Sequence, residues 1–259
     1  MTTGNETKFA VSAPDGHHLS IHLVAGEGNH CVLMLHGITS ERTEGGLYTD
    51  LTHHLLNRNI SAAAFDFRGH GESKMTFEMA TVAGMALDFA SAYKVLTARY
   101  AEVTLVCASF GASIALLASR ALTLSSTKRV VLLNPVLSYA ETFSHATTTW
   151  GKNFFPQVDS AEFWDIRTHD TGDRNLHLGR EMITQIALMD PEQLGFDSGK
   201  QITIIHGTED DIVPIALSQA FVARSEGDTT LIEVRGASHG FEGHEEFVLD
   251  KVIQVITSR

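Results

Sequence analysis

Short apolar runs alternate with longer helical patterns along most of this chain of 259 residues. The first two runs, Lys8–Ala13 and Leu19–Val24, flank a Pro-Asp-Gly turn and predict a β-hairpin. Further strands are predicted at Cys31–Leu35, Ile60–Phe65, Val103–Cys107, Val130–Asn134, Ile202–His206 and Leu231–Arg235. Helices are predicted at Leu47–Asn57, Val82–Thr97, Ser113–Ala121, Ile215–Ser225 and Glu245–Ile256. This alternation predicts an α/β fold with a mostly parallel eight-stranded sheet and helices on both faces.

One segment interrupts the alternation. More than sixty residues separate Pro135 from Gln201, which is too long for a simple connection between a strand and the next element. The segment is rich in aromatic residues, so we expect it to be ordered. We predict a core formed by residues 1–137 and 200–259, with residues 138–199 inserted after the sixth strand as a lid or cap. A peripheral extension with its own small core is the alternative.

Ser109 stands where a buried strand turns into an apolar helix. The strand Val103–Cys107 precedes it, and small residues followed by Ile114, Leu116 and Leu117 continue at helical spacing. A serine on such a turn exposes its hydroxyl beside a helix N-terminus, which is the geometry of a nucleophile elbow. Ser109 is therefore the candidate nucleophile.

A nucleophilic serine needs a base and an acid later in the chain. His239 lies in a glycine-flanked loop after the last predicted strand, at the sheet edge where open α/β sheets place their ligand sites. The loop after Ile202–His206 offers Glu209, Asp210 and Asp211 as acids that could orient the imidazole. Because one of these carboxylates could instead cap the following helix, the residues alone do not separate Asp210 from Asp211.

The developing oxyanion of an acyl transfer needs N–H donors. The backbone N–H of Phe110 and that of Ile38, in the loop after Cys31–Leu35, are the candidates, and Gly37 permits close approach of that loop. The candidate substrate-binding residues are His36, Gly37, Trp150, Phe154 and Trp164.

Composition narrows the remaining function classes. The formal net charge of −12 argues against nucleic acid and anionic membrane partners. The polar segment from Met1 to Phe9 lacks the apolar core of a signal peptide, and no transmembrane span is predicted. Two cysteines in predicted buried strands indicate free thiols, so we expect a cytoplasmic protein. No nucleotide-binding loop or zinc signature is present, and we expect no cofactor and no metal.

Taken together, these motifs resemble those of the α/β-hydrolase superfamily over nearly the whole chain. The resemblance rests on His36-Gly37, the Asp-x-Arg-Gly-x-Gly-x-Ser turn that starts at Asp66, the acid loop from Gly207 to Pro214, and the Gly-Ala-Ser-His-Gly loop around His239. It implies that Asp210, rather than Asp211, is the acid, and the order Ser, Asp, His agrees. Within the superfamily, His36-Gly37-Ile38-Thr39 with Glu44-Gly45-Gly46-Leu47 downstream is similar to bacterial feruloyl or cinnamoyl esterases and lysophospholipase-like hydrolases. Those enzymes cleave acyl esters under a cap inserted after the sixth strand.

The elbow departs from the common Gly-x-Ser-x-Gly pattern because Cys107 stands two residues before Ser109. A cysteine there could widen or tilt the turn. Thioesterases related to bioluminescence also lack the first glycine, so the departure is compatible with catalysis and favours a thioesterase or acyltransferase alternative. Cys107 itself is expected to pack inward at the strand end.

We therefore predict a serine hydrolase that cleaves a carboxylic ester through an acyl-enzyme, with a small-molecule acyl ester as substrate. The alternative is a thioesterase or acyltransferase acting on acyl groups carried by coenzyme A or by an acyl-carrier protein. A hydrolase fold used only as a receptor or scaffold is a third hypothesis, which the presence of all three catalytic residue types disfavours. The oligomeric state is left open.

Overall fold

The computed structural model describes residues 6–173, 176–197 and 199–258. Eight strands form one sheet in the order β1-β2-β4-β3-β5-β6-β9-β10. Their bounds are β1 Glu6–Ser12, β2 His18–Val24, β3 His30–Leu35, β4 Ser61–Phe65, β5 Glu102–Ala108, β6 Arg129–Leu133, β9 Gln201–Gly207 and β10 Thr229–Val234. Strand β2 runs antiparallel to both of its neighbours, whereas the other adjacent pairs are parallel. The mostly parallel eight-stranded sheet expected from the sequence is confirmed.

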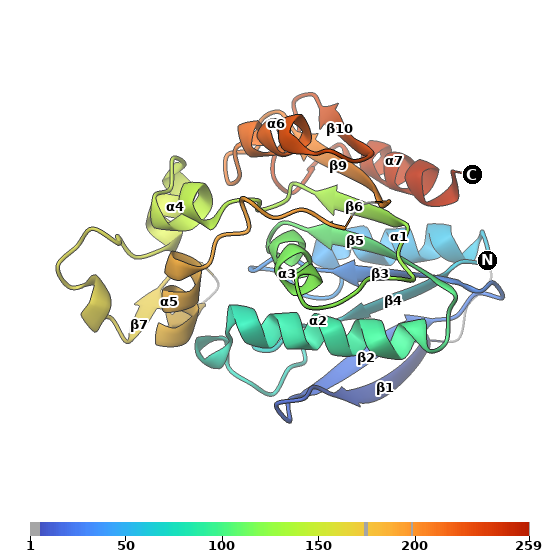
Figure 1. Ribbon diagram of the computed structural model, residues 1–259, viewed down its shortest axis with the longest axis horizontal. Helices are drawn as coiled ribbons and strands as arrows, with labels where there is room; N and C mark the ends of the chain where they lie inside the picture. The colour runs from blue at the N-terminus through green and yellow to red at the C-terminus, as the bar shows by residue number, and fades with distance from the viewer. Residues whose placement is uncertain (1–5, 174–175, 198, 259) are drawn as a thin grey trace.

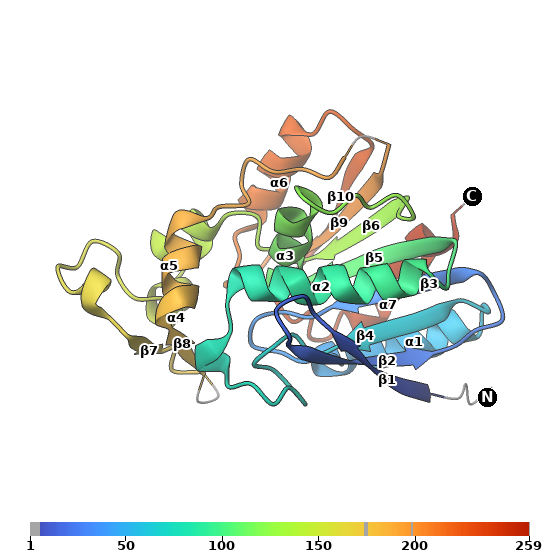
Figure 2. The same cartoon turned by 60° about the horizontal axis from the view of Figure 1, so that its bottom comes forward.

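Helices cover both faces of this sheet (Figures 1 and 2). Helices α1 (Leu47–Leu56) and α7 (Glu245–Thr257) pack on one face, and α2 (Val82–Thr97), α3 (Phe110–Ser119) and α6 (Ile215–Arg224) pack on the other. Alternate strand residues face opposite layers, since side chains alternate along a strand. In β5, for example, Val103, Leu105 and Cys107 join the core under α2 and α3, while Val106 and Ala108 join the core under α1 and α7.

The segment between β6 and β9 forms several short elements beyond one end of the sheet (Figure 1). They are a π-helical turn Ala140–Ser144, α4 Thr149–Phe154, a 3₁₀ turn Phe163–Asp165, the antiparallel pair β7 Thr168–Asp170 and β8 His177–Gly179, and α5 Arg180–Leu188. Its aromatic residues continue the main core, because Tyr139 stacks on Phe110 of α3 with ring centroids 5.4 Å apart and Phe143 lies edge-on to the same ring. The aromatic content of this segment is therefore largely a packing feature.

Element boundaries differ little from expectation. Helix α3 begins at Phe110, three residues before the predicted start, because the small residues that follow Ser109 enter the helix directly instead of extending the turn. Two 3₁₀ turns, Glu44–Gly46 and Phe77–Met79, were not predicted. Residues 1–5 of the polar N-terminal segment lie outside the described residues. Among those described, no helix combines the length and apolarity that crossing a membrane requires.

Candidate active site

Ser109 occupies a sharp turn directly between β5 and α3. Its backbone has φ 47° and ψ −116°, a conformation that a non-glycine residue adopts only under strain. The end of β6 holds the turn, because the Ser109 N–H donates to the Leu133 carbonyl (2.8 Å) and the Ser109 carbonyl accepts from the Val136 N–H (3.0 Å). A side chain at Gly111 would place its Cβ 2.7 Å from the Leu35 carbonyl oxygen, so this position needs glycine. The serine is thus presented as in a nucleophile elbow.

Cys107 does not disturb the turn. Its side chain is fully buried in the core under α2 and α3, and strand pairing with β6 continues through the next residue, Ala108. Burial raises the pKa of the Cys107 thiol well above its ordinary value, so the thiol stays neutral. Both cysteines of the chain are free and buried.

The structure brings Ser109, His239 and Asp210 into one hydrogen-bonded line. Nε2 of His239 lies 3.1 Å from Oγ of Ser109, and Nδ1 lies 2.7 Å from Oδ2 of Asp210. Because a carboxylate only accepts hydrogen bonds, Nδ1 carries the ring proton and Nε2 is free to accept the serine proton. The three side chains come from the turn after β5, the loop after β9 and the loop after β10, and these three parallel strands end at the same edge of the sheet.

The environment of Asp210 keeps its carboxylate ionised. Burial acts to raise the pKa of Asp210, but hydrogen bonds from His206 and His239 hold it well below the ordinary value. Oδ1 also accepts the N–H groups of Ile212 and Val213, at 2.9 and 2.8 Å. Asp211, by contrast, is exposed and lines the cavity.

The loop after β3 lies against Ser109. A Cβ added at Gly37 would come within 3.2 Å of the Ser109 Cβ and 3.7 Å of its Oγ. In the described part of the chain, neither the Ile38 N–H nor the Phe110 N–H has a hydrogen-bond acceptor. Both candidate oxyanion donors are therefore available to a substrate carbonyl.

His36 supports this loop from behind and does not reach the cavity. It is 1% exposed, and its ring accepts the Phe67 N–H at Nε2 (3.0 Å) and donates from Nδ1 to the Gly37 carbonyl (2.8 Å). Burial lowers the pKa of His36 to about 3, so the ring is neutral. The expectation that His36 contacts substrate is therefore corrected, because both ring nitrogens are used inside the protein.

A cavity of about 540 Å³ opens above the serine. Ser109, His239 and Trp150 line it, so Trp150 alone of the three aromatic candidates reaches it. Phe154 is buried and stacks on Trp150 with ring centroids 4.3 Å apart. Trp164 is 56% exposed and lies near Arg180 on the outer side of the segment. The expectations for Phe154 and Trp164 are corrected, because an aromatic count cannot tell core from cavity.

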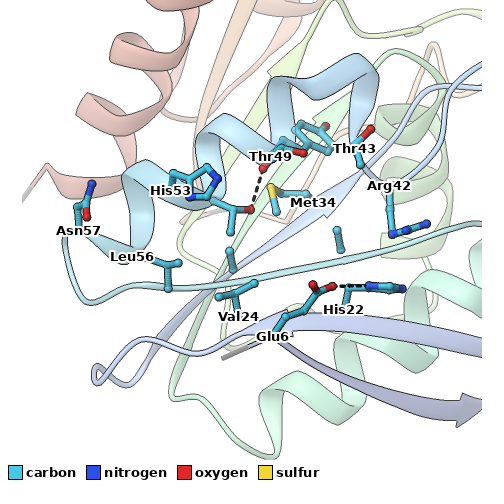
Figure 3. A pocket seen from close by; sticks show the side chains of 14 residues that line it. Glu6, His22, Val24, Met34, Arg42, Thr43, Thr49, His53, Leu56 and Asn57 are labelled. Carbon is cyan, nitrogen blue, oxygen red and sulfur yellow. Dashed lines mark hydrogen bonds and ion pairs between the residues drawn. The ribbon is translucent and has the colours of Figure 1, made fainter. Parts of the chain in front are cut away.

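A larger cavity of about 810 Å³ lies between α1 and strands β2 and β4 (Figure 3). The small side chains of Ala62 and Ala64 leave its floor open, and Glu6 and His22 pair at its rim (2.6 Å). Neither Ser109 nor His239 lines this cavity. Since no hydroxyl of its described lining hydrogen-bonds to a histidine, we place the candidate active site in the smaller cavity.

Asn134, predicted only as the last residue of a strand, joins the acid loop to the histidine loop. Its side-chain N–H₂ donates to the carbonyls of His239 (2.6 Å) and Ser238 (3.3 Å), and its Oδ1 accepts the Gly207 N–H (2.8 Å). Its backbone has φ 41°, a left-handed value that asparagine tolerates better than most residues. In the sequence, the pair Asn134-Pro135 after β6 was the signal that could have drawn attention to this residue.

Replacing Asn134 with aspartate should lower kcat at least tenfold. The side chain keeps its size, but a carboxylate oxygen would face two carbonyl oxygens and would loosen the loop that carries His239. Losing these buried donors should also lower the free energy of unfolding by about 2 kcal/mol. Steady-state kinetics and urea unfolding measure both effects. Asn59→Asp is the matched control, because Asn59 has a similar φ of 60° on the far, exposed end of α1. Equal kinetics for the two variants would contradict the role of Asn134.

Glu44 is a second residue of the site that was not among the predicted site residues. Its carboxylate lines the cavity, and Oε2 accepts the Gly37 N–H at 2.7 Å. Burial raises the pKa of Glu44 to about 7, although the hydrogen bond from Gly37 acts to lower it. The signal in the sequence was a glutamate followed by two glycines, which predicts an unusual turn.

This raised pKa predicts a pH-dependent stability. The unfolded chain ionises Glu44 near pH 4.5 and the folded chain near pH 7, so the folded state binds more protons between these values. The stability that the protonated Glu44 contributes is fully present below pH 4.5. It is lost as the pH rises through about 7, by an amount on the order of 3 kcal/mol. Glu44→Gln should therefore be more stable relative to wild type at pH 8 than at pH 5. Urea unfolding at both pH values tests this, and a difference that does not change with pH would refute it.

Comparison with known proteins identifies the family and the fold of the chain. The Hydrolase_4 family model, described as serine aminopeptidase, S33, matches residues 26–176, which is more than half of the chain. No curated protein sequence matches the chain. Est1E from Butyrivibrio proteoclasticus, solved with ferulic acid bound, is 18% identical, with 96% of this chain and 100% of that chain covered and a TM-score of 0.80.

Two further solved structures extend the comparison. The esterase EaEST from Exiguobacterium antarcticum is 18% identical over 97% of this chain and 100% of its own, with a TM-score of 0.70. XC6422 from Xanthomonas campestris, described as an α/β serine hydrolase without lid, is 16% identical over 99% of this chain and 95% of its own, with a TM-score of 0.67. At these identities the likeness concerns the fold, whereas the family match concerns the sequence itself. The chain belongs to the serine aminopeptidase S33 family and has the α/β-hydrolase fold.

Proposed function

We propose that the protein hydrolyses a carboxylic ester through an acyl-enzyme. The observation that carries the proposal is the line from Asp210 through His239 to Ser109, with distances of 2.7 and 3.1 Å. His239 takes the proton of Ser109 as Oγ attacks the ester carbonyl, and then gives that proton to the leaving alcohol. Water, deprotonated by the same imidazole, attacks the acyl-enzyme and releases the acid.

The remaining groups have supporting roles in this proposal. The ionised carboxylate of Asp210 keeps the proton on Nδ1 of His239 and stabilises the imidazolium that forms. The N–H groups of Ile38 and Phe110, which have no acceptor among the described residues, hold the oxyanion. No step needs a metal or a cofactor.

The cavity supports an oxyester more than a thioester carried by coenzyme A or an acyl-carrier protein. Its described lining contains no lysine and no arginine that could meet a phosphate. Its acidic members are Glu41, Glu44, Asp173, Asp211, Glu242 and Glu245. An anionic carrier would be repelled by such a lining. A neutral acyl group fits better, and Trp150 offers an aromatic wall for a phenylpropenoyl group such as the one in the ligand of Est1E.

Residues 138–199 would act as a lid in this proposal. They contribute Trp150 and Asp173 to the described cavity lining and lie beyond the sheet edge that carries the site (Figure 2). Because a neighbour described as lidless shares the fold, we assign the lid to substrate choice and not to the chemical step.

The test is kcat/KM for oxyesters and thioesters that share one acyl group, repeated over short, long and phenylpropenoyl chains. We expect a preference for oxyesters, with the highest values for aromatic acyl groups. A large thioester preference would overturn the oxyester assignment. Failure of a fluorophosphonate probe to label Ser109 would overturn hydrolysis itself and favour a binding role for the fold.

A further inference from the structure

Glu44 lies beside the nucleophile, yet the proposed reaction gives it no task. Its carboxylate lines the same cavity as Ser109 and accepts the Gly37 N–H at 2.7 Å. The Ser40 side chain also hydrogen-bonds to it. Both partners belong to the oxyanion loop, which we define as residues 36–40, and they flank Ile38. The carboxylate therefore hydrogen-bonds to this loop on both sides of Ile38, whose N–H is the candidate oxyanion donor.

The backbone of Glu44 is held in an unfavourable conformation. Its φ is 47°, and the two residues that follow, Gly45 and Gly46, have φ of 64° and 105°. Glycine adopts such values readily, whereas a glutamate does so at a cost that its surroundings must offset. The bonds from Gly37 and Ser40 supply that offset. The side chain is thus fixed over the oxyanion loop by contacts and not by backbone preference.

The opposite side of the oxyanion loop is anchored as well. The Gly37 carbonyl accepts from His36 (2.8 Å), and the Ile38 carbonyl accepts from Nε2 of His70 (2.8 Å). Because the Gly37 N–H already donates to Glu44, it is not available to an oxyanion. Of the polar backbone groups of Gly37 and Ile38, only the Ile38 N–H then has no partner among the described residues.

We propose that Glu44 is a positioning residue that aims the Ile38 N–H at the substrate carbonyl by fixing the oxyanion loop from its cavity side. The proposal rests on the proposed ester hydrolysis, because it assigns Ile38 to the oxyanion of that reaction. Glu44 itself does not touch the reacting atoms. What it supplies is a hydrogen-bond acceptor at a fixed place, which a glutamine amide oxygen can replace.

Three variants test this role. Glu44→Ala removes the acceptor, Glu44→Gln keeps an acceptor without charge, and Glu44→Asp withdraws the carboxylate from Gly37. We expect Glu44→Ala and Glu44→Asp to lower kcat about 10- to 100-fold, part of the loss seen when an oxyanion donor is removed, with KM within about threefold. Glu44→Gln should stay within about threefold of wild type. Glu246→Ala, an exposed carboxylate in the first turn of α7, is the matched control and should change neither constant.

The rate at which a fluorophosphonate labels Ser109 gives a second readout, since phosphonylation also develops an oxyanion. It should fall with kcat in Glu44→Ala and recover in Glu44→Gln. Should Glu44→Ala fail to fold, Glu44→Asp carries the same comparison. Wild-type rates in both Glu44→Ala and Glu44→Asp would overturn the proposal, as would equal losses in Glu44→Gln and Glu44→Ala, or a loss confined to KM.

These outcomes are separable from a failure of the proposed function. If no ester is turned over in a manner that needs Ser109, ester hydrolysis is wrong, but the labelling rates still decide whether Glu44 positions the loop. If ester hydrolysis is present and the labelling rate ignores Glu44, only the positioning role is wrong.

Discussion

Replacing Ser109 with alanine should lower kcat for every ester substrate by about 10⁴-fold or more, because the nucleophile acts as a unit with its base. Oγ is the atom that His239 Nε2 approaches to 3.1 Å, and no other hydroxyl hydrogen-bonds to that nitrogen in the described residues. The variant should fold, since the backbone bonds of the turn to Leu133 and Val136 do not involve the hydroxyl. Hydrolysis rates beside an unfolding curve measure both effects.

Cys107→Ala is the control for Ser109→Ala. Cys107 is the other nucleophile near the turn, but its thiol is buried and neutral, so its removal should cost about 1 kcal/mol of stability and leave kcat within a few-fold. Substantial turnover by Ser109→Ala, or abolition of turnover by Cys107→Ala, would reverse the assignment of the nucleophile.

A glycine at the same position separates strain from chemistry. Ser109 holds φ 47°, which glycine adopts without a steric penalty. Ser109→Gly should therefore be inactive like Ser109→Ala but more stable than it, by about 1 kcal/mol. A strained serine at the reacting centre lowers the stability of the fold and is retained for activity. The difference in the free energy of unfolding between Ser109→Gly and Ser109→Ala measures the strain.

The architecture followed from the sequence because its signals are local. Each strand of the sheet has its own apolar run, and each main helix has its own periodicity, so the strand–helix alternation needed no knowledge of contacts. The site loops could be located for the same reason. Parallel strands end at one edge, so loops after β5, β9 and β10 were expected to meet there.

The features that could not be predicted depend on the direction in which a side chain points and on which residues it contacts in the folded chain. Phe154 and Trp164 share a segment with Trp150. Phe154, in α4, is buried and Trp164, in the 3₁₀ turn Phe163–Asp165, is exposed, so of the three only Trp150 lines the cavity. Asn134 bonds to backbone groups that are distant in the chain, and no local pattern encodes such partners. Glu44 bonds to Gly37, only seven residues earlier, but through a turn whose shape the residue pattern does not specify. His36 was misassigned because a histidine beside a functional loop can serve that loop from either side.

Replacing Asp210 with asparagine should lower kcat about 10³- to 10⁴-fold, the second largest effect we expect. The amide can no longer hold the proton on Nδ1 of His239, so the wrong tautomer would present a proton and not a lone pair to Ser109. The neutral amide would also be a weaker acceptor than the carboxylate for His206 Nε2, which lies at 3.2 Å, and for the N–H groups of Ile212 and Val213. The free energy of unfolding should fall as well.

Asp211→Asn is the matched control, since the two aspartates are neighbours in the same loop. Asp211 is exposed, and the hydrogen bonds of the His239 ring go to Asp210 and Ser109, so replacing Asp211 should cost less than tenfold in kcat. A pH series adds an independent signature. The pKa of Asp210 is depressed in the folded state, so its contribution to stability is present above the unfolded pKa near 3.8 and is lost as the pH falls below it. Acid unfolding of Asp210→Asn should lack this component, while Asp211→Asn should keep it. If Asp211→Asn proved the more damaging in both assays, the acid would belong to the exposed position, and the 2.7 Å contact between Asp210 and His239 would be structural and not catalytic.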